Sequence, residues 1–161
     1  MYYKYSYEIN NYGIIRVIVN AETEEVLFCA RDVAKAFGFR EPGKVANDRC
    51  LNVIKEKHYT PSGIQTLNFI DKTEIDKLVM SDFSIDKMCY IRSLAQVRDM
   101  SVTQARKKTE KIIVDEISTM VKLFNKKSDR INDAILVMPN GKTYHIKDDG
   151  SVHDISEAVG A

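Results

Sequence analysis

The stretch that begins at Ile14 alternates between two hydrophobic periods, and this alternation limits what the chain can fold into. Residues 14–19, 26–29 and 64–70 show the two-residue period and the β-branched or aromatic content of strands. The segments between them repeat apolar residues at the spacing of helices. We therefore predict one α+β domain over residues 14–98, in which the first two strands pair and the third joins the same small antiparallel sheet.

Local signals place helices between these strands. Gly38 follows an apolar run that ends at Phe37, as expected for a glycine that terminates a helix in the left-handed conformation. Pro42 suits the first turn of a second helix, and Asp71 with Glu74 has capping-box spacing at the start of a third. Six large apolar side chains fall on the inward phase of their elements and are the predicted core: Phe28, Val33, Phe37, Phe39, Leu67 and Phe69.

The sequence after residue 98 predicts a long helix. Ser84 can cap a shorter helix before it, and Ser101 with Gln104 forms a second capping box. Over residues 101–127 one side of the helix is apolar, through Ala105, Thr109, Ile112, Ile113, Ile117, Met120, Val121 and Phe124. The 23 residues from 102 to 124 form a rod about 35 Å long, so its apolar side either packs against the preceding domain or pairs with a second copy. We favour a homodimer through residues 102–124.

The tail, residues 134–161, predicts a C-terminal β-hairpin extension. Asn140-Gly141 is the dipeptide that a type I′ turn prefers, because both central residues of that turn need positive φ. Asp154 is placed to cap a last helical turn.

Composition excludes several classes of protein. The charged fraction of 29% and the apolar fraction of 44% are those of an ordinary globular chain. No apolar run is long enough to cross a bilayer, and the first residues lack a secretory signal, so we expect a cytoplasmic protein without membrane contact. Three widely separated cysteines, Cys29, Cys50 and Cys89, offer neither a disulfide framework nor a zinc motif, and we expect buried thiols.

The net charge of +1 conceals two basic blocks, because residues 31–57 sum to +3 and residues 87–127 to +6. A nucleic-acid binder needs a local basic surface and not a high overall pI. The first block contains six candidate nucleic-acid-binding residues, four of which (Lys44, Arg49, Lys55 and Lys57) we expect on one exposed face. The six are Arg40, Lys44, Asn47, Arg49, Lys55 and Lys57. Asn52 is a further side chain suited to base edges, and a solvated surface without a ligand is the alternative.

The sequence lacks the recognisable patterns of catalysis and of cofactor binding. It contains no phosphate-binding loop, nucleophile elbow or HExxH helix. His58, His145 and His153 are too scattered to form a ligand set with the cysteines. We therefore expect no catalytic residues, no cofactor and no metal site.

The order of motifs resembles the Bro-N domain of phage antirepressors and large-virus DNA-binding proteins. In that family a strand runs into F-x-A-x-D-V-x-x-A-L-G-Y, and a basic helix, a GG-E/Q turn and a strand leading into a helix follow. The matching residues here are Phe28, Ala30, Asp32, Val33, Ala36, Phe37, Gly38 and Phe39, with Ser62-Gly63-Ile64-Gln65 at the turn. The family's closing helix contains a tryptophan, and this chain has none.

The resemblance implies a DNA-binding regulator of transcription of the phage or prophage antirepressor type. Its partner would be double-stranded DNA, contacted through the basic helix-strand segment. Because an antirepressor acts by disabling a repressor, the alternative is a protein-interaction module that binds a repressor or other regulator without touching DNA.

Overall fold

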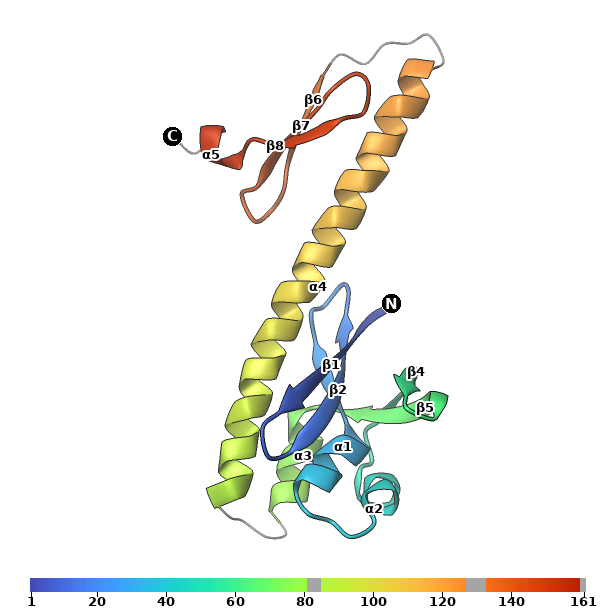
Figure 1. Ribbon diagram of the computed structural model, residues 1–161, viewed down its shortest axis with the longest axis vertical. Helices are drawn as coiled ribbons and strands as arrows, with labels where there is room; N and C mark the ends of the chain where they lie inside the picture. The colour runs from blue at the N-terminus through green and yellow to red at the C-terminus, as the bar shows by residue number, and fades with distance from the viewer. Residues whose placement is uncertain (81–84, 127–132, 160–161) are drawn as a thin grey trace. The chain divides into compact units, whose positions relative to one another are not determined.

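The computed structural model describes residues 1–80, 85–126 and 133–159 and divides the chain into two compact units, Met1–Ala105 and Arg106–Ala161. Helix α4 (Ile85–Lys126) contributes residues to both units (Figure 1). Across the described part of the chain, no helix combines the length and the apolar character that crossing a bilayer requires.

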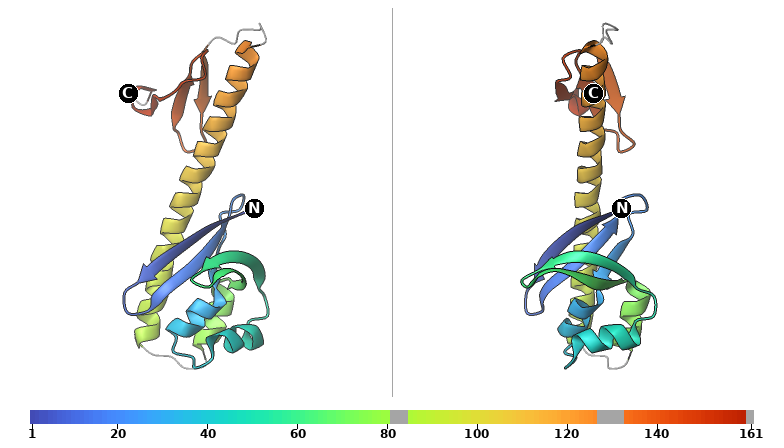
Figure 2. Two further views of the ribbon diagram at one scale, coloured as in Figure 1. Left: turned by 45° about the vertical axis from the view of Figure 1, so that its right-hand side comes forward. Right: turned by 90° about the vertical axis from the view of Figure 1, so that its right-hand side faces the viewer.

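The first unit contains the predicted α+β domain, built on a curled five-stranded antiparallel sheet of order β1-β2-β3-β5-β4 (Figure 2). β2 (Gly13–Asn20) pairs with β3 (Val26–Cys29), and β3 pairs with β5 (Gly63–Ile70). These pairings confirm the prediction. The first strand, β1 (Tyr2–Ile9), was not expected. The sequence of residues 54–60 fits either a loop or a strand, and in the structure it is a strand, β4 (Ile54–Thr60).

Alternate residues of the sheet enter two different clusters. Ile15, Val17 and Phe28 belong to the main core together with residues of the helices. Ile18, Leu27, Cys29, Leu67 and Phe69 form a smaller cluster on the other side of the sheet. The period of two that identified the strands thus sorts their side chains between two cores.

Three short helices follow the predicted order: α1 (Ala30–Ala36), α2 (Pro42–Arg49) and α3 (Lys72–Val79). Gly38, just past α1, has φ +81°, which only glycine adopts without strain. Of the six predicted core residues, five are buried. Phe39 is half-buried and packs against the edge of the main core.

An ion pair joins α1 to the sheet. The carboxylate of Asp32 accepts hydrogen bonds from the backbone nitrogen of Arg16 at 3.0 Å and from its Nε at 2.8 Å. A further contact joins Arg16 Nη2 to Asp32 Oδ1. The hydrogen bond to Asp32 raises the pKa of the Arg16 guanidinium. Asp32 therefore fixes the first turn of α1 onto β2.

The predicted helix start at Ser101 is wrong, because α4 passes through this position without interruption. Ser101 is buried, and its hydroxyl lies 2.7 Å from the carbonyl oxygen of Val97 and 3.0 Å from the hydroxyl of Tyr7. A serine that bonds the carbonyl four residues back can lie inside a helix. Tertiary contact with β1 therefore replaces the cap, and the predicted cap Ser84 lies outside the described residues.

Two of the three cysteines are buried as expected. Burial raises the pKa of Cys29 to about 12 and also raises that of Cys50, so neither is reactive as a thiolate near neutral pH. Cys89 differs from the expectation, since it is exposed on α4.

The second unit contains a three-stranded antiparallel sheet, β6 (Ala134–Val137), β7 (Thr143–Ile146) and β8 (Val152–Asp154), followed by α5 (Ser156–Val159). The hairpin was predicted, but its type I′ turn was wrong. Gly141 has φ +86°, whereas Asn140 has no positive φ. Pro139 fixes a negative φ at the start of the turn, which suits a type I turn followed by one left-handed glycine.

A second turn of the same pattern follows and was missed. Lys147 donates its backbone N–H to Ser151 at 2.9 Å, as Met138 does to Lys142 at 2.8 Å. Gly150 has φ +79° and occupies the position that Gly141 has in the first turn. Asp148-Asp149-Gly150 is therefore a hairpin turn leading into β8.

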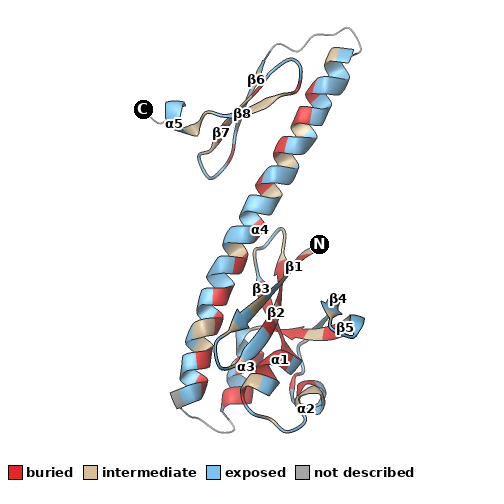
Figure 3. Ribbon diagram, viewed as in Figure 1, coloured by how far each residue is buried: buried red, intermediate tan, exposed pale blue. Residues whose placement is uncertain are grey.

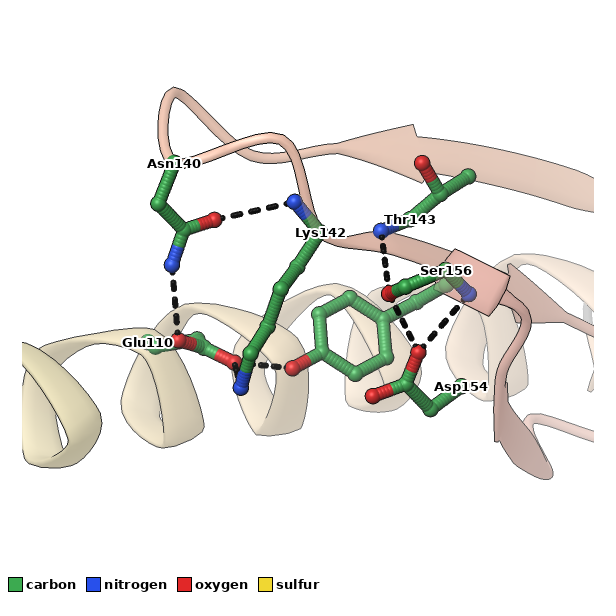
Figure 4. A network of polar contacts seen from close by, with 7 residues as sticks. Glu110, Asn140, Lys142, Thr143, Asp154 and Ser156 are labelled. Atoms are coloured by element: carbon green, nitrogen blue, oxygen red, sulfur yellow. Dashed lines mark hydrogen bonds and ion pairs between the residues drawn. The ribbon is translucent and has the colours of Figure 1, made fainter. Parts of the chain in front are cut away.

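Glu110 of α4 holds the first of these turns within the second unit (Figure 4). Its carboxylate accepts hydrogen bonds from Lys142 at 2.8 Å, from Asn140 at 3.1 Å and from the hydroxyl of Tyr144. Burial raises the pKa of Glu110, but these hydrogen bonds outweigh it and leave the pKa below its ordinary value. A carboxylate on the helix thus orders the turn through polar contacts, which the sequence did not predict.

Truncating Phe37 to alanine tests the main core. Its ring meets that of Tyr90 edge to face, with centroids 5.5 Å apart, and both side chains are buried. We expect Phe37→Ala to lower the free energy of unfolding by about 3–5 kcal/mol, measured by urea denaturation. Tyr59→Ala is the matched control, because that ring is 75% exposed. An equal, small effect of both changes would contradict the core assignment.

Candidate nucleic-acid interface

The candidate surface lies on a two-stranded ribbon formed by β4 and β5. β3 pairs with β5 only at Phe69 and Ile70, whereas β4 pairs with β5 along its whole length, from Ile54 to Thr60. The remaining part of the ribbon therefore extends away from β1–β3, as Figure 1 shows. Its far end is largely exposed (Figure 3).

The two sides of the ribbon differ in burial. His58 and Leu67 are buried on one side, where the His58 ring lies 6.0 Å from that of Phe69 in the smaller core. Because side chains alternate along a strand, Lys55 and Lys57 lie on the other side. Both are exposed, and their cross-strand partners on that side are Asn68 and Thr66. Burial of one side thus decides which side chains the ribbon presents to solvent.

Helix α2 lies beside the exposed side of the ribbon. Asn68 Nδ2 donates a hydrogen bond of 2.9 Å to Asn47 Oδ1, which joins β5 to α2. A hollow with polar walls surrounds this amide pair, lined by Arg31, Gly43, Ala46, Asn47, Gln65, Thr66, Leu67 and Asn68. Fold geometry therefore brings together two predicted residues, Lys55 and Lys57, with the predicted Asn47.

The other predicted cations of this segment are more dispersed. Lys44 and Arg49 are exposed on α2, but five helical residues correspond to about 140° around the axis. Arg49 lies over the ring of Phe39, 5.3 Å from its centroid. Arg40 is exposed between α1 and α2. The arrangement differs from the expectation that Lys44, Arg49 and the two ribbon lysines share one face.

The acidic residues near the ribbon do not neutralise the positive charges of Lys55 and Lys57. Glu56 lies on the opposite side of β4 and pairs with Lys4 at 3.3 Å. Glu41 approaches Lys44 at 3.9 Å, with both side chains 70% exposed, so solvent screens that pair. Among the ion pairs of the described residues, none includes Lys55 or Lys57. The exposed side of the ribbon is therefore locally positive.

Sequence reasoning missed Arg31 and misplaced Asn52. Arg31 is exposed at the start of α1 and lines the same hollow as Asn47. The only hint in the sequence was that Arg31 directly precedes Asp32, a residue of the motif at the start of α1. Asn52 instead lines a different hollow with Leu27 and Phe69 of the smaller core, on the other side of the sheet.

Glu74 of α3 fixes the chain just before β4. Its backbone nitrogen donates to Asp71 at 2.9 Å, which confirms the predicted aspartate cap. The Glu74 carboxylate does not close the capping box; it is fully buried, accepts from the backbone nitrogen of Leu51 at 3.2 Å and pairs with Lys77 at 2.7 Å. The hydrogen bond from Lys77, together with the backbone donors, lowers the pKa of Glu74. This carboxylate therefore helps to hold the segment that leads into Lys55.

Comparison with known proteins adds no assignment: no family model, curated protein or solved structure matches the chain. Within the described residues, no group of three or more histidine, cysteine, aspartate or glutamate side chains is arranged to hold a metal ion. The candidate site is therefore argued from its own geometry.

The pH dependence of stability tests the role of Glu74. Its folded pKa is lowered from the ordinary value of 4.5, so its contribution to stability is present above that pH and is lost as pH falls through the folded pKa. We expect Glu74→Gln to cost about 1–3 kcal/mol at pH 7 and to flatten the loss of stability below pH 4.5, in urea denaturation at several pH values.

The matched control for Glu74→Gln is Asp76→Asn on the same helix, where the side chain is 52% exposed and its ion pair with Lys72 measures 4.0 Å. An equal change in both variants would show that burial of Glu74 carries no special weight.

Proposed function

We propose that this chain is a DNA-binding regulatory protein of the kind that its resemblance to phage antirepressors implies, and that it contacts duplex phosphates through the β4–β5 ribbon. The observation that carries the proposal is the exposed pair Lys55 and Lys57, which no acidic side chain among the described residues neutralises. Lys and Arg on a rigid surface supply phosphate contacts. Here the rigidity comes from strand pairing on one side and the smaller core on the other.

Arg31 extends this positive surface from the ribbon towards α1. Arg31 shares the hollow with Asn47 and Asn68, and Gly43 of α2 also lines it. Lys44, Arg49 and Arg40 are exposed outside this hollow and would add to the positive field around it. Electrostatic attraction of this kind acts over about 10 Å at ordinary salt.

The salt dependence of duplex binding tests the proposal. Each phosphate neutralised contributes about −0.9 to the slope of log affinity against log salt. We expect Lys55→Ala/Lys57→Ala to weaken binding to mixed-sequence duplex and to reduce the steepness of the slope by about 1.8. The measurement is fluorescence anisotropy of labelled duplex at several salt concentrations.

The control Lys72→Ala/Arg98→Ala removes the same formal charge from the groove between α3 and α4, where both side chains lie. We expect it to leave the slope nearly unchanged. A ribbon variant that binds duplex as the parent does would refute the phosphate contacts.

We propose further that α4 pairs with a second copy. In the second unit Val114, Ser118 and Val121 are buried, and Ser118 donates to the carbonyl oxygen of Gly150. Four large apolar side chains on other sides of the helix stay well exposed: Ile112, Met120, Leu123 and Phe124, at 39%, 54%, 58% and 50%. Burying such a stripe against its own copy would form a dimer seam, and two copies would double the phosphate contacts.

Charge placed in this stripe tests the dimer. We expect Met120→Glu/Phe124→Glu to convert a dimer, twice the 18.4 kDa chain mass, into a monomer in light scattering coupled to gel filtration. The control Asp115→Lys changes an exposed residue five positions before Met120, about 140° around the helix. A parent that is monomeric at high concentration would refute pairing.

The alternative is a protein-interaction module that binds a repressor or other regulator without DNA. The observation that favours it is Ile135 and Val137, which are 67% and 66% exposed on β6, an edge strand of the second sheet. Exposed apolar edges are templates for strand pairing with another chain. Co-purification with a repressor, together with no binding to duplex at any salt, would support this alternative over the first.

A further inference from the structure

The free part of the β4–β5 ribbon has the dimensions of a major-groove reader. Six residue pairs, from Lys55 with Asn68 to Thr60 with Gly63, lie beyond the pairing of β5 with β3. At about 3.3 Å per residue they extend roughly 20 Å. The major groove of B-DNA is about 12 Å wide and admits a two-stranded ribbon.

Near the sheet, the exposed side of the ribbon carries cations on β4 and polar side chains on β5, and the exposed pair Tyr59 and Ile64 follows towards the turn. Lys55 and Lys57 lie on β4, and their cross-strand partners Asn68 and Thr66 lie on β5. Cations suit the phosphates that border a groove, whereas amides and hydroxyls suit base edges inside it. The sheet register therefore places a phosphate-contacting row beside a base-contacting row.

The hydrogen bond between Asn68 and Asn47 fixes the orientation of one amide. Because Asn68 Nδ2 gives one of its two hydrogens to Asn47 Oδ1, the second hydrogen and the Oδ1 acceptor are left for a ligand. A donor beside an acceptor complements the N7 acceptor and the N6 donor of adenine, the usual partner of asparagine in the major groove.

Helix α2 is less suited to enter the groove. Its Asn47 is the residue that orients Asn68, and its cations Lys44 and Arg49 lie about 140° apart. Its contribution to the interface is therefore to position the ribbon amide.

We propose that the β4–β5 ribbon enters the major groove of duplex DNA, with Asn68 recognising an adenine and Asn47 acting as a positioning residue. This inference rests on the proposed function and adds the element that carries specificity. The proposal predicts weaker binding to double-stranded RNA, because its major groove is too deep and narrow for the ribbon to enter.

The test is a selection of binding sites from a random duplex library with the full chain, followed by anisotropy on the selected duplex and its single-base variants. The parent should show one adenine whose replacement weakens binding about 5- to 150-fold. Asn68→Ala should abolish the preference at that position alone. Asn68→Asp should shift it towards cytosine, because a carboxylate accepts from the cytosine amino group.

Asn47→Ala supplies a second variant on the exposed surface of α2. It should weaken the preference for adenine, because the amide of Asn68 is then no longer held by Asn47. Thermal melting checks that each variant is folded. Preference retained in both Asn68 variants would overturn the inference, as would equal binding to double-stranded RNA. Steeply salt-dependent binding of duplex without any base preference would overturn only this inference, whereas no duplex binding at all would overturn the proposed function too.

Discussion

The ion pair between Asp32 and Arg16 is the contact from which the arrangement of the first unit follows. Asp32 lies two residues into α1, directly after β3, and bonds both the backbone and the guanidinium of its partner on β2. A buried ion pair contributes little net stability because desolvation offsets the attraction, but removing one partner is costly. Here the ion pair fixes the position of the first turn of α1 on the sheet. Arg31, the residue before Asp32, consequently lines the hollow beside α2.

A second buried carboxylate, Glu74, acts at the other end of the same segment. It holds the backbone at Leu51, where the chain turns from α2 into β4. The candidate interface is thus fixed on both sides by buried carboxylates. Between them β3 is short, so the outer part of β5 has only β4 as a neighbour. A longer β3 would have covered the ribbon, and the short one leaves a projecting two-stranded element.

The second unit uses a different means to order a small sheet. Three short strands bury little apolar surface, and Glu110 compensates by bonding three side chains of one hairpin at once. Glu110 lies on the same side of α4 as Ile117 and Val121, because 7 and 11 residues each return to within about 20° around the helix. Met120 and Phe124, farther round the helix, stay exposed, so these contacts with the hairpin do not cover the whole apolar side.

The sequence by itself determined the elements whose signals are local. Period-two and helical runs over residues 14–98 predicted the strands and helices, the pairing of β2 with β3, and five of six core residues, because side-chain direction follows from backbone period. It also identified the basic segment that includes Lys55 and Lys57.

Tertiary structure alone decided what depends on distant partners. Ser101 bonds Tyr7, so it does not begin a helix. Arg31 and Asn47 line one hollow because β5 returns beside α2. Charge along a chain is a one-dimensional property, and which cations share a surface depends on how the sheet folds back on itself.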